Sequence, residues 1–165
     1  MIEFARHTLA APPAVGEYWE GQGGIYAGIM PDYVGTSPYH LIVSTEEAVD
    51  VKWGPYGVPE DGARSTQDGH ANTSALNRCH HRHEAARWAA EYRKDGHDDF
   101  YLPAHRELKM AAASVPDRFS RSEWYWSSTE DTARDAQGAN FNGMDLGTLF
   151  KSFAGRARAV RRIFI

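Results

Sequence analysis

The stretch EWYWSSTE, at residues 123–130, indicates how the fold is organised. Three consecutive aromatic residues, Trp124, Tyr125 and Trp126, are followed at once by polar residues. Successive side chains of a strand point to opposite faces, so the two tryptophans would share one face and Tyr125 would lie on the other. We expect the tryptophans to pack in the scaffold, and the Ser-Ser-Thr residues to bond to backbone where the strand gives way to a loop.

The segments on either side predict short strands around two helices. Residues 23–31 and 39–44 are rich in β-forming side chains and are separated by turn residues, which predicts a hairpin. Residues 71–96 read as one helix, and a shorter helix is expected to begin near Pro103. The last third alternates apolar and polar pieces, as antiparallel strands do. The sequence therefore predicts an α+β domain whose closing strand pairs near the first.

Length, charge and composition narrow the class of protein. A chain of 165 residues favours one core, so we expect an N-terminal arm at residues 1–16 and a single domain at residues 17–165. A net charge of −4 disfavours nucleic acid as a partner, and no apolar run is long enough to insert into a membrane. The single Cys79, together with the lack of a signal-peptide pattern, suits a protein made in a reducing cytoplasm.

The sequence carries little that indicates catalysis. It contains no GxSxG, GxGxxG or Walker motif. In CHHRH, at residues 79–83, Cys79 and His83 would share one face of a helix, where a zinc ion could bridge them. The alternative, solvated surface histidines, is favoured because no second Cys or His pair has matching spacing. The acidic run at residues 95–99 lacks the closing Glu of a calcium loop. We therefore expect no catalytic residue, no metal and no cofactor.

Residues 138–155, GANFNGMDLGTLFKSFAG, follow neither a strand period nor a helix period. Aromatic and apolar side chains alternate irregularly with small polar ones. Two interpretations remain open for this stretch. It is either an exposed patch for a binding partner or a hairpin with ordinary core residues.

Seven segments, taken together, are similar to one known family. They are GGIYAGIM, YHLIVS, STQDGHANTSAL, EAARWAAEY, DFYLPAHREL, YWSSTE and RARAVRR, in this order across about residues 21–162. They resemble the Lcl C-terminal-like family, which is common in phage and bacterial surface proteins. The resemblance implies a C-type-lectin-like fold, related to that of formylglycine-generating enzymes, with antiparallel strands, two helices and paired chain ends.

The resemblance also implies a role and a site. The role is a non-enzymatic binding or structural module of a phage virion, in the tail or baseplate. Its partner would be a host-surface glycan or protein receptor, or another phage tail protein, and a homo-oligomer would fit this role. The family's variable region corresponds to residues 130–154, with Phe150 and Phe153 as expected anchors. The expected ligand-binding residues are Asn140, Asn142, Met144, Asp145, Leu146, Thr148, Leu149, Phe150, Ser152 and Phe153.

Two alternatives stand beside this expectation. The protein could be a virion decoration protein without a host ligand. It could also be a metal-dependent enzyme of the formylglycine-generating type, although those enzymes use a cysteine pair and this chain has only Cys79. The chain also departs from the family's pattern: Gly138, Ala139 and Asn140 precede Phe141, where family members often carry Trp and Gln. The Glu-Pro-Asn motif of calcium-dependent lectins is also missing.

Overall fold

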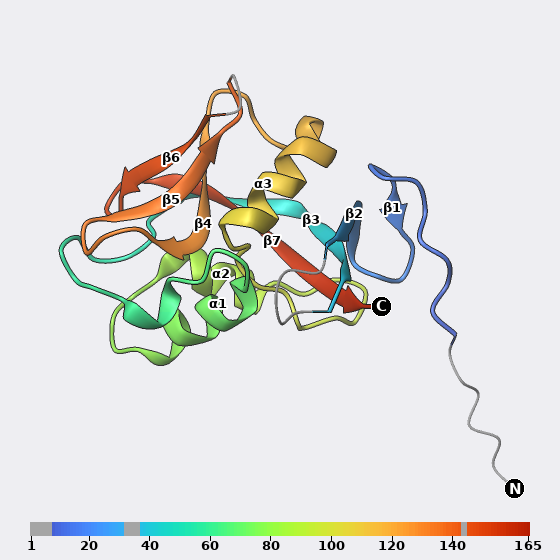
Figure 1. Ribbon diagram of the computed structural model, residues 1–165, viewed down its shortest axis with the longest axis horizontal. Coiled ribbons are helices and arrows are strands. Elements are labelled where there is room, and N and C mark those ends of the chain that lie inside the picture. Colours follow the sequence, from blue (N-terminus) through green and yellow to red (C-terminus); the bar gives the residue numbers. More distant parts are fainter. Residues whose placement is uncertain (1–7, 32–36, 143–144) are drawn as a thin grey trace, which may run out of the picture.

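The structure, a computed structural model, describes residues 8–31, 37–142 and 145–165. Within these ranges, seven strands form one sheet with the order β1-β2-β3-β7-β4-β5-β6, and three short α-helices pack against it (Figure 1). The strands are β1 (Tyr18–Trp19), β2 (Gly24–Met30), β3 (Tyr39–Val51), β4 (Trp124–Glu130), β5 (Asp135–Asn140), β6 (Asp145–Phe150) and β7 (Gly155–Phe164). The helices are α1 (Gly69–Arg78), α2 (Glu84–Glu91) and α3 (His105–Ser114), with 3-10 turns η1 (Asp61–Ala63) and η2 (Pro116–Arg118).

The last strand, β7, lies in the middle of the sheet. It pairs antiparallel with β3 along most of its length and parallel with β4 at Tyr125 and Arg156. The remaining neighbours are antiparallel, including the predicted hairpin of β2 and β3, which is confirmed. One parallel junction within an otherwise antiparallel set makes the sheet mixed.

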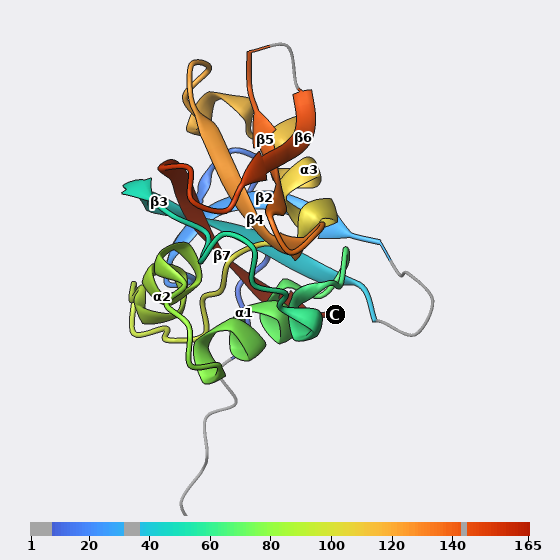
Figure 2. The same ribbon diagram turned by 90° about the vertical axis from the view of Figure 1, so that its left-hand side faces the viewer.

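The aromatic triplet in β4 contributes to the two larger of the three hydrophobic clusters in the described core, as its alternation predicts. Tyr125 packs in the cluster that α3 covers, whereas Trp126 packs in the cluster that α1 and α2 cover. Figure 2 shows these two helices together at one side of the sheet and α3 at another. The buried Trp126 also donates its indole N–H to the carbonyl of Val51 at 2.9 Å. This tryptophan is therefore part of the scaffold.

The polar half of the stretch is buried and remains a strand. Ser127 donates to the carbonyl of Gln137 at 2.7 Å, and Thr129 donates to the carbonyl of Ser65 at 2.8 Å. The predicted bonds to backbone are present, but β4 continues to Glu130 without giving way to a loop. These hydroxyl groups attach the strand to its neighbours because a buried polar group needs a partner.

The expected C-type-lectin-like α+β fold with two helices and paired ends is wrong. The fold is mostly β, since the strands of the mixed sheet hold more residues than the three short helices. The predicted helix at 71–96 is divided, because Cys79 is extended and α2 begins only at Glu84. The imidazole of His83 is buried against the carbonyl of Trp53 at 2.7 Å, a tertiary contact that outweighs local helix propensity.

The chain ends also differ from the expectation. Two strands, β2 and β3, separate β7 from β1, so the closing strand does not pair with the first. Of the predicted arm, residues 8–14 form no regular element, and residues 1–7 lie outside the described ranges. Position in the sheet depends on contacts between distant segments, which local patterning does not specify.

A buried carboxylate joins the core elements around α3. Glu107 accepts hydrogen bonds from the hydroxyl groups of Tyr39 at 2.8 Å and Tyr101 at 2.5 Å. Its other oxygen accepts from the backbone N–H groups of Gly69 at 3.0 Å and Ala104 at 3.1 Å. Burial raises the pKa of Glu107, and the four hydrogen bonds oppose that shift. With its side chain inaccessible, Glu107 acts as a structural junction.

Candidate functional site

The predicted binding stretch forms a hairpin at one edge of the sheet. β6 is the outermost strand, and among the described residues its ladder partner is β5 (Figure 1). Leu149 is half-buried against the Trp126 cluster, whereas Leu146 and Phe150 are exposed. An outer strand leaves one row of backbone groups without a ladder partner, which another molecule can use. The stretch is thus a hairpin whose outer strand carries apolar side chains into solvent.

Both expected anchors are exposed. Phe150 is 60% exposed and Phe153 is 45% exposed. Between them, Lys151 is buried, and its ammonium group lies 2.7 Å from a carboxylate oxygen of Glu130. Burial of a lysine is unusual unless the charge is paired, so this ion pair identifies an anchor for the turn after β6.

The environment of Lys151 holds the turn in place. Its ammonium group also donates to the carbonyl of Val58 at 2.7 Å and lies 4.8 Å from the ring centre of Trp53. Glu130 accepts two further hydrogen bonds, from Arg64 at 3.1 Å and from the backbone N–H of Glu60 at 2.5 Å. Two cations and a backbone donor therefore surround one buried carboxylate.

The backbone of Lys151 brings a distant aromatic residue to β6. Its carbonyl accepts hydrogen bonds from the N–H groups of Trp53 at 3.1 Å and Gly54 at 3.2 Å. Tyr56 follows two residues later, and its ring meets that of Phe150 edge-on, with centroids 5.6 Å apart and planes at 81°. Tyr56 is 50% exposed. We call Tyr56, Phe150 and Phe153 the aromatic patch.

A groove lies beside the aromatic patch. It has a volume of ≈ 390 Å³, and its lining combines the 52–56 segment, the start of α2 and the turn after β6. The lining residues are Lys52, Gly54, Pro55, Tyr56, His81, Arg82, Glu84 and Ser152. Ser152 is the expected site residue that reaches this groove. Apolar and charged side chains of both signs are thus available to a partner.

The other expected residues divide into exposed and structural positions. Asp145, Thr148 and Asn142 are exposed, whereas Asn140 is half-buried and accepts a hydrogen bond from the backbone N–H of Asn142 at 2.8 Å. Asn140 therefore shapes the turn. Met144 lies outside the described residues. Tyr56 was missed, because nothing in the sequence connects it with Phe150.

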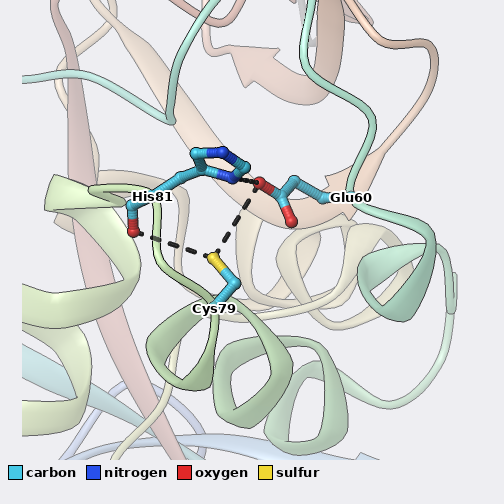
Figure 3. Close-up of side chains that lie close together, drawn as sticks. All are labelled: Glu60, Cys79 and His81. Carbon is cyan, nitrogen blue, oxygen red and sulfur yellow. Dashed lines mark hydrogen bonds and ion pairs between the residues drawn. The ribbon is translucent and has the colours of Figure 1, made fainter.

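A second cluster contains side chains that commonly bind metals. Glu60, Cys79 and His81 come from three points on the chain and converge (Figure 3). The nearer carboxylate oxygen of Glu60 lies 2.8 Å from Nδ1 of His81 and 3.9 Å from the sulfur of Cys79. The helix-face pairing of Cys79 with His83 does not occur, since α1 ends at Arg78, and the favoured interpretation as solvated surface histidines is wrong for the buried His83.

His83 belongs to the support of this cluster. Its Nδ1 donates to the carbonyl of Trp53 at 2.7 Å, and its Nε2 lies 3.1 Å from the same oxygen of Glu60. A carbonyl can only accept, so Nδ1 carries a proton. Nε2 and the Glu60 oxygen form a hydrogen bond as well. A buried hydrogen bond therefore fixes the direction of the Glu60 side chain.

Comparison with known proteins gives a fold likeness and no family. No family model matches the chain, and no curated protein gives a significant match. A solved structure of a fimbrial protein from Bacteroides ovatus ATCC 8483 is similar, with a TM-score of 0.53 and 14% sequence identity. The match covers 73% of this chain and 35% of the fimbrial protein, so the chain spans about a third of that protein's length.

This likeness supports the correction of the fold class and leaves the resemblance to the Lcl C-terminal-like family a prediction. At 14% identity it concerns the fold alone. Among the described residues, none of the helices has the length and apolar character needed to cross a bilayer.

Proposed function

We propose that this protein is a non-enzymatic binding module whose aromatic patch and β6 edge attach it to the surface of another molecule. The observation that carries the proposal is the exposed pair of Tyr56 and Phe150, held at the sheet edge by the buried Lys151. Exposed aromatic side chains on a rigid support lose little conformational freedom on binding, and such residues often dominate binding energy.

The setting we propose is the one that the sequence resemblance implies, a phage tail or baseplate. The partner would be a host-surface glycan or protein receptor, or another tail protein. The fold likeness to a fimbrial protein is compatible with a role at a surface. An aromatic patch beside a groove with Lys52, Arg82 and Glu84 suits either a sugar, which stacks on aromatic rings, or a protein.

The test uses phage particles that carry Tyr56→Ala and Phe150→Ala together. We expect normal incorporation of the protein and at least about a tenfold loss of adsorption to host cells, since central aromatic contacts each contribute about 2 kcal/mol or more. Phe164→Ala is the matched control, because Phe164 is 55% exposed and belongs to β7, away from β6 in the strand order.

The outcomes separate the remaining roles. Unchanged adsorption with intact particles would contradict receptor binding. Unstable particles with the double substitution, and stable ones with Phe164→Ala, would instead indicate docking to another virion protein. If the protein is missing from purified wild-type particles by mass spectrometry, the virion assignment is wrong.

A further inference from the structure

We propose that Glu60, Cys79 and His81 form a binding site for a zinc-type divalent ion. This inference does not depend on the proposed binding function, and it differs from the sequence-based expectation that the chain has no metal site. A carboxylate, a thiol and an imidazole are the side chains that supply the ligands of most zinc sites in proteins. Here one ligand atom from each lies within 4.8 Å of the other two.

The spacing of these atoms suits a tetrahedral ion. With metal–ligand distances of about 2.0–2.3 Å, ligand atoms of a tetrahedral site lie roughly 3.3–3.6 Å apart. The oxygen of Glu60 is 2.8 Å from Nδ1 of His81 and 3.9 Å from the sulfur of Cys79. These two separations lie on either side of the required range, so side-chain shifts of about half an ångström would bring both into it, and the third pair, Nδ1 of His81 and the sulfur of Cys79, lies within 4.8 Å.

The support around Glu60 distinguishes the cluster from a chance meeting of surface side chains. The Glu60 side chain is only 11% exposed, and the backbone N–H of Glu60 is bonded to the buried Glu130. Nε2 of the buried His83 contacts the same carboxylate oxygen at 3.1 Å and so helps to orient it, as partners of metal ligands commonly do. A carboxylate oriented by its own partners loses little freedom when it binds an ion.

The backbone also positions the thiol. Cys79 ends α1, where its N–H bonds to the carbonyl of Ala75, and its thiol donates to the carbonyl of Leu76 at 3.2 Å. Binding of the ion breaks the S–H bond and forms a metal–sulfur bond, and the proton leaves to solvent. A thiolate is the form that binds the ion, so metal ions and hydrogen ions compete for the sulfur and binding weakens as the pH falls.

Three protein ligands leave a fourth position for water. His81 lines both the groove beside the aromatic patch and a second cleft of ≈ 530 Å³ between α1 and α2. The fourth position would therefore be accessible from solvent. A site with one open position of this kind accepts a small ligand or a donor group from a partner.

The experiment uses full-length protein from which any tag has been removed, reduced and treated with a chelator. Calorimetric titration with Zn²⁺ should show one ion per chain. With Co²⁺ in its place, the absorption spectrum should contain a thiolate-to-cobalt band. Cys79→Ser should remove that band, and both Cys79→Ser and His81→Ala should weaken Zn²⁺ binding by at least about tenfold.

His80→Ala is the matched control, because His80 lies in the same short connection and outside the cluster. It should bind Zn²⁺ as the wild type does. Circular dichroism verifies that each variant is folded, and Zn²⁺ should raise the Tm of the wild type more than that of Cys79→Ser. The proposal is overturned if the wild type binds no ion, if the cobalt complex lacks the thiolate band, or if His80→Ala weakens binding as much as His81→Ala.

Discussion

Glu107 and Glu130 are both buried carboxylates, but the groups that donate hydrogen bonds to them differ in charge. Glu107 is surrounded by neutral donors, two tyrosine hydroxyl groups and two backbone N–H groups. Glu130 faces the cations of Lys151 and Arg64 and one backbone N–H. Neutral donors remain satisfied if the carboxylate becomes uncharged, whereas a buried cation then loses its counter-ion.

The two carboxylates also hold different parts of the molecule. Glu107 connects α3 with β3 and with the N-terminus of α1, all within the core. Glu130 connects the end of β4 with the turn after β6 and with the loop that contains Glu60. The neutral junction therefore stabilises the scaffold, and the charged junction positions the segments that carry the aromatic patch and the proposed metal site.

The largest effect should come from the same substitution at both positions. Glu130→Gln leaves the ammonium group of Lys151 buried without its counter-ion, and we expect a loss of about 3–5 kcal/mol in the free energy of unfolding. Glu107→Gln keeps an oxygen for the two N–H groups and an amide for the tyrosine oxygens, so about 1 kcal/mol is expected. Urea denaturation of both variants measures the difference. Equal losses would mean that the two junctions are alike.

A double substitution sharpens the comparison. Lys151→Met removes the stranded cation from the Glu130→Gln variant, so the double variant should be about 1–3 kcal/mol more stable than Glu130→Gln alone. The same denaturation measurement gives this coupling energy. If the losses of the two single variants simply add up in the double variant, the coupling energy between Glu130 and Lys151 is zero.

The pH dependence of the free energy of unfolding should differ between the wild type and Glu107→Gln. Because burial raises the pKa of Glu107, the folded state binds its proton more tightly than the unfolded state does. The contribution of Glu107 to the free energy of unfolding is complete when the pH is below the ordinary pKa range of glutamate. It is lost as the pH rises through the folded-state pKa, with a slope of at most about 1.4 kcal/mol per pH unit. Glu107→Gln should remove that slope. The same slope in both proteins would assign it to another group.

The smallest effect on stability should be at the aromatic patch. Phe150→Ala removes an exposed ring, and we expect the free energy of unfolding to change by no more than about 0.5 kcal/mol. Thermal unfolding of this variant beside Phe164→Ala provides the measurement. A loss of several kcal/mol would identify Phe150 as a core residue, contrary to its assignment to a binding surface.

Local patterns predicted the strands better than their arrangement. The alternation of Trp124, Tyr125 and Trp126 was sufficient to assign Tyr125 and Trp126 to opposite faces, and turn residues located the β2–β3 hairpin. The central place of β7 was not predictable, because it depends on pairing with segments more than a hundred residues away in the chain. The division of the long helix likewise follows from the contact of His83 with Trp53.

Local patterns predicted the exposure of two residues of the aromatic patch but not the contact between its segments. The exposure of Phe150 and Phe153 agrees with the irregular pattern of residues 138–155, which no core period explains. Tyr56 could not be connected with them, since the link runs through the backbone carbonyl of Lys151. The burial of Lys151 was not predictable either, because lysines are rarely buried without a paired charge, and sequence spacing alone does not reveal that pair.

The central position of β7 has a consequence for biosynthesis. In the described strand order, β7 is the link between the β1–β3 and β4–β6 halves of the sheet, and it leaves the ribosome after the other six described strands. Until then, the facing edges of β3 and β4 have no ladder partner, and apolar surface on both halves is open to water. The two halves of the sheet should therefore stay unjoined until residue 164 has left the ribosome, and the sheet should then close in one late, cooperative step.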